Sequence, residues 1–381
     1  MSALTAPAAA AAGGPDGLRA LLLSFDDGTP AAPPLGGQGV AVAGLAGHLP
    51  AAGAAVTVCS SRRGPAGFVW PGGGPTGRPA LDFSWWLARR LPRLGRLVRP
   101  QVWHAQSGPG GVLLLRLPAG APLVVTANHT YRQAHGGWWA TRPLAAVEGR
   151  GYRAAAHVLA ISPSTAVRVV ADHGVQPGRV SVVAPGIDTD RFRPPRDDEP
   201  DRDGATLLFC GRLDPVKGLR TFAALVDELA LERPELRAVV CGEGPERGAA
   251  ADLGRRWPGR VTVTGRLDDD ALARCQRRAT VCVMPSAYEG LGLVALEALS
   301  SETPVVAHDV SGLHDLGPAG VVLVPAGAPL ALAAAVRTLL DDPGRRTALG
   351  ARGRAHVLER HRWTEVAAAT AAVYRRVAQA G

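Results

Sequence analysis

The chain has 381 residues, of which 46% are hydrophobic and 20% are charged, and its formal net charge is +9. This length favours two α/β domains over one, and the composition excludes a largely disordered chain. No stretch reaches the roughly 18 consecutive apolar residues of a membrane-spanning helix, so none is expected. Residues 1–17 are mostly Ala, Gly and Pro and predict a disordered leader. No positive segment precedes their apolar stretch, which argues against a signal peptide.

The cysteines and the basic residues set two further limits. None of the five cysteines forms a CxxC pair or a zinc-like spacing, which is typical of reduced core cysteines in a cytoplasmic protein.

The positive net charge suits an anionic ligand, although an arginine-rich composition accounts for part of this charge. Lys217 is the single lysine in the sequence. Because arginine fills almost every other cationic position, Lys217 is predicted to lie where a compact ammonium group is needed.

Short apolar runs alternate with helical spacing through the first half of the chain. A glycine-rich turn is predicted at 33–39, with a helix after it. Ser162 follows an apolar run and opens a helix, as an N-cap residue does. The charged, proline-bearing segment 194–204 is interpreted as a linker between domains. Strands are predicted at 18–24, 55–59, 102–105, 123–126, 158–161 and 180–183.

The same alternation restarts at residue 206. Strands are predicted there at 206–210, 238–241, 261–263, 280–284, 304–307 and 320–324. This order predicts two parallel, doubly wound sheets, one in each half of the chain. Ligands of such open sheets bind off the carboxyl ends of the strands. Most strands of the second half end in glycine, a charge or a small polar residue, which suits such a site.

Residues 285–299 predict a strand end, a loop and then a helix. Gly290 and Gly292 let the backbone come close to a ligand, and the helix start beyond them offers unpaired N–H groups to a diphosphate or to sugar hydroxyls. Glu289 precedes this helix and Glu297 lies about one turn into it. Both carboxylates can accept hydrogen bonds from sugar or ribose hydroxyls. The alternative is that both are ordinary surface glutamates.

Arg212 and Lys217 form a second candidate group, in a loop between a predicted strand and a predicted helix. Two cations at that place would neutralise a diphosphate and stabilise it as a leaving group. The alternative is a pair of exposed loop cations without a ligand.

Motifs in these two segments resemble one known family. Residues 211–218 resemble the G-R-L-x-x-x-K-G segment of family-4 retaining glycosyltransferases, and 289–297 resemble the E-x7-E motif of that family. Similar landmarks occur in the expected order at 162–164, 185–188, 242–245 and 303–307.

This resemblance covers about residues 18–374 and implies a GT-B fold. Two Rossmann-like, doubly wound domains would face a cleft, and a C-terminal helix would cross back to the N-terminal domain. The acceptor-binding domain would span 18–195 with the helix 361–381, and the nucleotide-sugar-binding domain would span 205–360.

The resemblance also implies roles for the matching residues. Arg212 and Lys217 would bind the donor diphosphate. Glu297 would bind the ribose hydroxyls, and Glu289 would contact the transferred sugar. Further donor contacts would come from the backbone of Gly290, Leu291, Gly292 and Leu293, from Arg266 beside the base, and from Gly36 and Gly37 of an N-domain glycine loop.

His129 completes the predicted catalytic set of Glu289, His129, Arg212 and Lys217. It follows a predicted strand, and in the family a histidine near this point often faces the donor sugar. The alternative is a structural histidine, and His104 is the less favoured catalytic candidate. The sequence departs from the family after Val310, where the shorter Asp315 stands in a segment that commonly carries glutamate.

The implied activity is that of a retaining, metal-independent hexosyltransferase. It would move a hexosyl or N-acetylhexosaminyl group from a nucleotide-diphosphate sugar, with UDP favoured, to a hydroxyl of a polyol, aminocyclitol or other small natural product. No enzymic nucleophile is evident, so a front-face route through an oxocarbenium-like state is expected. No cofactor besides the nucleotide sugar is expected, and no metal is expected. The run of three aspartates at 268–270 could suggest a metal site, but it is interpreted as a solvated helix start.

Several other functions compete with this interpretation. Transfer to a lipid or polysaccharide at the inner membrane face is one, and a nucleotide-sugar epimerase or hydrolase is another. A binding protein with an inactive site is a third. An NAD-dependent oxidoreductase is disfavoured, because no G-x-G-x-x-G opens the first helix at 36–39.

Residues 85–99 carry two tryptophans and five arginines, a composition that can lie on anionic lipid. Pro92 and Gly95 are expected to interrupt a helix there, so only a weak peripheral membrane contact is predicted. The arginines of the chain are scattered, and no nucleic-acid partner is expected. Nothing in the sequence selects an oligomeric state.

Overall fold

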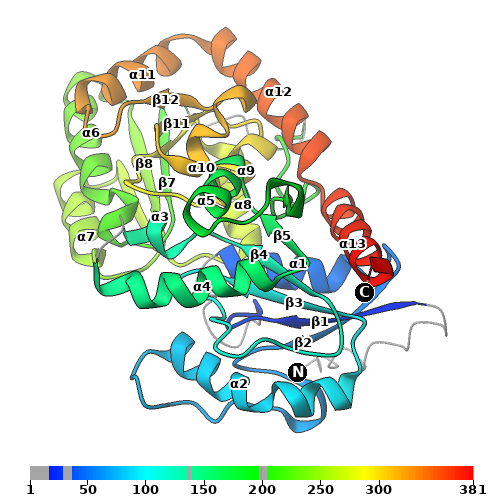
Figure 1. Ribbon diagram of the computed structural model, residues 1–381. Helices are drawn as coiled ribbons and strands as arrows, with labels where there is room; N and C mark the ends of the chain where they lie inside the picture. Colours follow the sequence, from blue (N-terminus) through cyan, green and yellow to red (C-terminus); the bar gives the residue numbers. More distant parts are fainter. Residues whose placement is uncertain (1–16, 29–36, 136–138, 197–198, 200–203, 381) are drawn as a thin grey trace, which may run out of the picture. The chain divides into compact units, whose positions relative to one another are not determined.

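The computed structural model describes residues 17–28, 37–135, 139–196, 199 and 204–380 (Figure 1). The chain divides into two compact units. Unit 1 comprises residues 1–160, 168–183 and 366–381, and unit 2 comprises residues 161–167 and 184–365. Each unit is built on one six-stranded parallel sheet. The predicted disordered leader falls almost wholly outside the described residues.

The sheet of unit 1 has the strand order β2-β1-β3-β4-β5-β6, and every neighbouring pair is parallel. Its strands are β1 (Leu18–Leu23), β2 (Ala54–Cys59), β3 (Val102–Ser107), β4 (Leu123–Ala127), β5 (His157–Ala160) and β6 (Val180–Val182). The helices of the first half of the chain are α1 (Gly37–His48), α2 (Pro79–Val98), α3 (Tyr131–His135), α4 (Arg142–Ala154) and α5 (Pro163–His173).

The sheet of unit 2 has the order β12-β11-β10-β7-β8-β9, again with parallel neighbours throughout. Its strands are β7 (Thr206–Cys210), β8 (Arg237–Cys241), β9 (Val261–Gly265), β10 (Val281–Met284), β11 (Val305–His308) and β12 (Val322–Val324). The helices of the second half are α6 (Leu219–Glu232), α7 (Arg247–Arg256), α8 (Asp269–Arg278), α9 (Leu293–Ser300), α10 (Ser311–His314), α11 (Pro329–Asp341), α12 (Pro343–Arg360) and α13 (Trp363–Ala380).

Alternation along β10 shows why this sheet is covered on both faces. Val281 and Val283 belong to the core cluster that includes α6, α7 and α11 residues. Cys282 and Met284 belong to the cluster that includes α9 and α10 residues. Successive strand residues point to opposite faces, so a continuous apolar run is the pattern of a strand buried between two layers of helices. The predicted doubly wound, parallel sheets are confirmed.

Helix α2 differs from its prediction, because it runs through Pro92 and Gly95 without a break. Pro92 lies on the exposed side of the helix, where the carbonyl that loses its partner can be hydrated. Gly95 lies against the Trp103 ring, and a Cβ built there would be 3.2 Å from a ring carbon. The glycine therefore lets the helix approach β3 closely.

Other local predictions have mixed outcomes. Helix α1 already begins at Gly37, so the predicted turn at 33–39 is wrong at its last three residues. The Ser162 N-cap is confirmed, because its hydroxyl accepts a hydrogen bond from the Thr165 amide at 3.2 Å. Asp268 caps α8 in the same way through the Ala271 amide at 2.7 Å, as expected for a helix start.

The chain crosses between the units more than once. Residues 184–195, expected in the N-terminal domain, belong to unit 2, and Ile187 and Phe192 lie in its core. Residues of α13 from Val366 onward belong to unit 1. There the Tyr374 hydroxyl lies 2.5 Å from Nδ1 of His104 on β3.

Candidate active site

The strand order of unit 2 marks one place where a ligand can enter. From β7 the chain winds outward to β8 and β9, whereas from β10 it winds in the opposite direction to β11 and β12. The loops after β7 and β10 therefore diverge at a topological switch point, where open α/β sheets bind their ligands. Both motif segments found in the sequence follow these two strands.

Lys217 and Glu289 meet at this switch point. The Lys217 ammonium donates to Oε1 of Glu289 at 2.6 Å, and the Ser286 hydroxyl donates to the same oxygen at 3.1 Å. Glu289 is 8% exposed, so it is not a solvent-facing glutamate. A carboxylate with two donors on one oxygen is held in a fixed orientation.

Close backbone contacts join the two loops. Gly218 has a φ of +76°, and a Cβ built there would lie 2.1 Å from the Pro285 carbonyl oxygen. The Ala287 amide donates to the Val216 carbonyl at 2.8 Å. Only glycine combines this backbone conformation with this approach, so Gly218 permits the contact that brings Lys217 to Glu289.

The loop after β10 delivers free amides to the same edge of the sheet. Gly292 has a φ of +92° and directly precedes α9. The Gly312 amide donates to the Glu289 carbonyl at 3.1 Å and fixes the start of the loop. Within the described part of the chain, the amides of Gly290, Leu291 and Leu293 donate to no other group. They can bind an oxyanion or a sugar hydroxyl.

Glu297 lies on α9 with one buried, unsatisfied oxygen. Its Oε2 has no hydrogen-bond partner among the described residues. Burial, with a smaller contribution from the charge of Asp269, raises the pKa of Glu297 to about 8. A carboxyl group in that environment gains from a hydroxyl that donates to it, since an unpaired buried acceptor costs free energy.

Arg212 and Arg266 are the two predicted cations at the rim of the site. Arg212 follows β7, its side chain is 63% exposed, and it pairs with Asp214 at 2.9 Å. Arg266 follows β9 and is also exposed. Both occupy carboxyl-end loops of the sheet, where their long side chains can reach a bound anion.

The remaining predicted residues belong to unit 1. Gly37 is the first residue of α1, and Gly36 lies outside the described residues. His129 follows β4 and is partly buried, and its carbonyl oxygen lies where a Cβ on Gly108 would be 2.6 Å away.

His104 has a structural environment. Its Nε2 lies 2.7 Å from the Thr126 hydroxyl, and its Nδ1 contacts Tyr374. Burial lowers the pKa of His104 to about 3, so the ring is neutral at physiological pH. Both ring nitrogens of His104 have hydrogen-bond partners within unit 1. His104, the less favoured catalytic candidate, is therefore a structural residue.

Asp315 also has a structural role. Its carboxylate accepts hydrogen bonds from the Ser164 amide at 3.0 Å and from the Ser164 hydroxyl at 2.7 Å. It thus satisfies donors in the first turn of α5.

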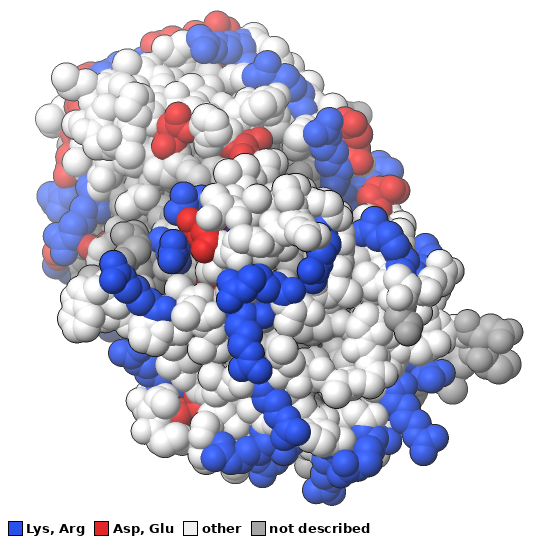
Figure 2. Space-filling view, in the orientation of Figure 1, with Lys and Arg blue, Asp and Glu red and all other residues white. Residues whose placement is uncertain are grey.

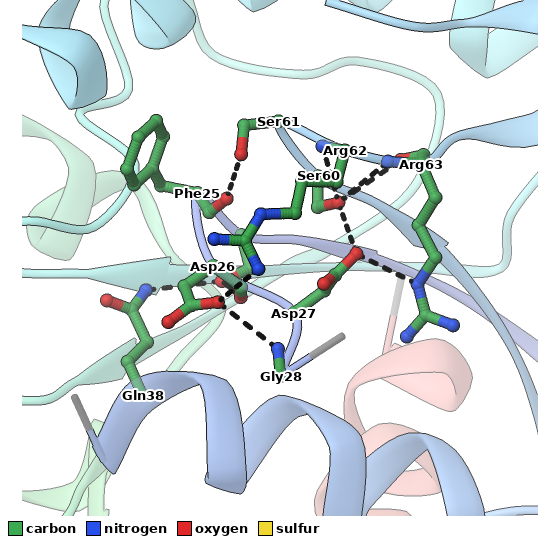
Figure 3. A network of polar contacts seen from close by, with 10 residues as sticks. Phe25, Asp26, Asp27, Gly28, Gln38, Ser60, Ser61, Arg62 and Arg63 are labelled. Carbon is green, nitrogen blue, oxygen red and sulfur yellow. Dashed lines mark hydrogen bonds and ion pairs between the residues drawn. The ribbon is translucent and has the colours of Figure 1, made fainter. Parts of the chain in front are cut away.

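A polar network at the carboxyl end of β1 was not found in the sequence (Figure 3). Asp26 and Asp27 follow β1 and are 2% and 1% exposed. Asp27 accepts from the Ser60 hydroxyl at 2.6 Å and from Nε of Arg63 at 3.1 Å. Asp26 accepts from the Gly28 amide at 3.2 Å, and an Arg62 nitrogen lies 3.8 Å from it.

This network joins the loops that follow β1 and β2, and β1 is also one of the two strands, β1 and β3, at the switch point of unit 1. Gln38, on α1, connects the two strand ends: its amide nitrogen lies 3.2 Å from the Ser24 hydroxyl and 3.5 Å from the Gln106 carbonyl. The signal in the sequence was a pair of acidic residues directly after an apolar strand, a position where buried carboxylates are functional candidates.

Two features are absent from the described residues. No group of three or more His, Cys, Asp or Glu side chains there is arranged to hold a metal ion. No helix in that part of the chain has the length and apolar character needed to cross a bilayer.

Comparison with known protein families gives two adjoining matches. Residues 35–191 match the model described as Glycosyltransferase Family 4, and residues 204–342 match the model described as Glycosyl transferases group 1. In structure, the chain is similar to sucrose-phosphate synthase from Thermosynechococcus elongatus, with a TM-score of 0.80, 24% identity and coverage of 96% of this chain and 100% of the other. The Anabaena HepE structure with UDP-glucose gives a TM-score of 0.70 at 18% identity, covering 94% of this chain and 100% of the other. These likenesses show the fold.

Sequence relatives extend the match. Glycogen synthase of Mycobacterium tuberculosis is 33% identical over 75% of this chain and 71% of its own length. MMP alpha-(1->4)-mannosyltransferase of Mycolicibacterium hassiacum is 32% identical over 81% of this chain and 77% of its own length. D-inositol 3-phosphate glycosyltransferase of Kineococcus radiotolerans is 40% identical over 54% of each chain, so the match spans about half of that relative. The ordered motifs, the two Rossmann-like sheets and these matches agree, and the chain belongs to glycosyltransferase family 4.

Proposed function

We propose that this chain transfers a hexosyl or N-acetylhexosaminyl group from a nucleotide-diphosphate sugar to a hydroxyl of a small-molecule acceptor. UDP is the favoured nucleotide, the anomeric configuration is retained, and no metal takes part. The observation that carries the proposal is the Lys217–Glu289 contact of 2.6 Å at the switch point of unit 2. This contact places Lys217, a cation that can bind the diphosphate, beside Glu289, a carboxylate that can bind the sugar.

The donor is held by groups already described. Arg212 and Lys217 neutralise the diphosphate, and the amides of Gly290, Leu291 and Leu293 donate to its oxygens or to sugar hydroxyls. Glu297 accepts from the ribose hydroxyls, which satisfies its buried Oε2. Arg266 borders the base.

Glu289 orients the sugar by accepting from its hydroxyls. The bond between the anomeric carbon and the diphosphate oxygen breaks as the acceptor oxygen bonds the same carbon on the same face. The acceptor proton moves to the departing phosphate, so no enzymic nucleophile is required. Cations and amides placed beforehand stabilise the charge that develops on the leaving group.

Unit 1 supplies the acceptor side. Near its switch point, Arg62 and Arg63 can bind an acidic substituent of the acceptor, and the buried Asp26 and Asp27 carboxylates hold these two arginines in place. His129, which follows β4 in the same unit, is the candidate catalytic histidine.

The test is turnover of purified variants with a panel of UDP-, GDP- and ADP-sugars. Lys217→Ala and Glu289→Ala should each lower turnover by about a hundredfold or more, because each removes charge stabilisation at the reacting centre. Arg274→Ala removes an exposed cation from α8 and should leave turnover unchanged. Near-normal turnover in a folded Lys217→Ala or Glu289→Ala variant would contradict the assigned roles.

Further measurements test the metal-independent and retaining character of the transfer, and the two competing enzyme functions. The wild-type protein should keep full activity in EDTA, and the product should have the anomeric configuration of the donor. Release of nucleotide without transfer to any acceptor would point to hydrolysis. Thermal stabilisation by NAD but by no nucleoside diphosphate would point to an oxidoreductase.

A further inference from the structure

The charge of this protein is divided unequally between its two units. Unit 1 holds 18 arginines and six acidic residues, a net charge of +12. Unit 2 holds 24 basic and 27 acidic residues, a net charge of −3. An arginine-rich composition affects both units alike, so composition alone does not explain a positive charge confined to unit 1.

The acidic residues of unit 1 that the structure describes are also buried or nearly buried. Asp26, Asp27, Asp82 and Glu148 are at most 2% exposed. The Asp172 side chain is 9% exposed and pairs with Arg168 at 2.9 Å. Within the described residues, the accessible surface of unit 1 therefore presents arginines with almost no accessible carboxylate beside them.

Helix α2 concentrates this charge on one face. Arg89, Arg93 and Arg96 are exposed at helical spacing along its outer side. Several blue side chains lie among uncharged ones in the lower part of the view in Figure 2, where Figure 1 draws α2. The one acidic residue of α2, Asp82, is buried and accepts from the amide and hydroxyl of Thr76 at 2.9 and 2.8 Å.

Two large apolar side chains lie among these arginines. Trp85 is 41% exposed, and the Arg89 guanidinium lies over its ring at 3.3 Å. Leu97, near the other end of the same helix, is 47% exposed. The inner side of α2 packs on the core through Phe83, Leu87 and Leu94. The helix is therefore anchored, and its outer face is a fixed surface of arginine, tryptophan and leucine.

We infer that this α2 face docks unit 1 on an anionic lipid surface. Arginines near such a membrane are attracted to acidic headgroups, and tryptophan prefers the interface between headgroups and acyl chains. A polyanion without an apolar layer would use the cations but would leave Leu97 in water. The inference is independent of the sugar donor and of the acceptor.

The experiment measures binding of the purified full chain to vesicles, in the absence of any sugar nucleotide. One set is phosphatidylcholine alone, and the other is an equal mixture of phosphatidylcholine and phosphatidylglycerol, each at low and at high salt. The test variant carries Arg89→Gln, Arg93→Gln and Arg96→Gln. The matched control carries Arg345→Gln, Arg352→Gln and Arg360→Gln, three exposed positions of α12 in unit 2.

The wild-type protein should bind the anionic vesicles, bind pure phosphatidylcholine far more weakly, and release at high salt. The α2 variant should lose about a hundredfold in affinity, and the α12 variant should bind like the wild type. Trp85→Ser should weaken binding to the anionic vesicles at low salt, although it removes no charge, because it removes the apolar contribution. Thermal melts establish that all variants are folded.

Three outcomes would overturn the inference. They are no binding of the wild type to anionic vesicles at low salt, unchanged binding of the α2 variant, and an equal loss in the α12 control. Tighter binding to a single-stranded oligonucleotide than to vesicles, lost in the α2 variant, would instead assign the face to nucleic acid.

Discussion

Single residues decide the chemistry at the carboxyl ends of the two sheets. The sequence predicted Lys217, Glu289 and Gly292 because each follows a strand in a motif whose spacing is local. It did not predict that Lys217 donates to Glu289 at 2.6 Å, or that Gly218 lies against Pro285. Those contacts join β7 and β10, and no local pattern encodes which strands become neighbours.

Glu297 provides a prediction about pH. Between about pH 5 and 8 it is protonated in the folded protein and ionised in the unfolded chain, because burial raises its pKa to about 8. The folded state then binds the extra proton, so the free energy of unfolding falls as pH rises through this window. Glu297→Gln should remove that fall and be more stable than the wild type by roughly 2–4 kcal/mol at pH 8.

Urea unfolding without nucleotide, repeated from pH 5 to pH 8, would measure this difference. Glu235→Gln, at a side chain that is 60% exposed, is the matched control and should follow the wild-type pH dependence. Parallel wild-type and Glu297→Gln curves would show that Glu297 is ionised in both states.

At the scale of elements, the twelve strands in the described part of the chain were all predicted with bounds within two residues of those observed. Buried parallel strands are short continuous apolar runs, which the sequence displays directly. Helix α2 was predicted less well, since proline inside a helix is usually disruptive. Packing of Phe83, Leu87 and Leu94 on the core outweighs that local cost.

The junction between η4 (Pro215–Lys217) and α6 depends on Gly218, and a matched pair of substitutions tests this. Gly218 and Gly259 have φ values of +76° and +74°, but a Cβ built at Gly259 would meet nothing within 4 Å. Gly259→Ala should therefore cost only conformational strain, about 1 kcal/mol. Gly218→Ala adds a clash with the Pro285 carbonyl and should cost about 3 kcal/mol or more.

The two variants would be compared by chemical denaturation and by turnover. Gly218→Ala should also lose activity, because displacing the loop moves Lys217 away from Glu289. Equal stability losses in the two variants, with activity kept, would show that the loop shifts without consequence.

At the scale of the whole molecule, the net positive charge of the sequence does not show that the charge lies in unit 1. That distribution becomes visible only when residues are assigned to the two units. Net charge is additive along a chain, and the sequence shows neither which residues share a unit nor which carboxylates are buried. The placement of α13 is likewise not evident from local sequence patterns. Residues of α13 belong to unit 1, and the Tyr374–His104 contact of 2.5 Å joins positions 270 residues apart.

Tyr374→Phe tests that contact. The substitution keeps the buried ring but leaves Nδ1 of His104 without its hydroxyl partner, which should lower the free energy of unfolding by about 1–2 kcal/mol. Urea denaturation at neutral pH would measure the change. An unchanged midpoint would mean that the buried hydrogen bond contributes no net stability.

The return of α13 has a consequence for synthesis on the ribosome. Unit 2 is almost continuous in sequence and is complete once Glu365 has emerged. Most of unit 1 precedes unit 2 in the sequence, but unit 1 lacks Tyr374 and the rest of its part of α13 until residues after Glu365 have been translated. Domains generally fold in the order in which they are made, N-terminal first. Here we expect unit 2 to reach its final packing first, because unit 1 still lacks α13 when unit 2 is complete.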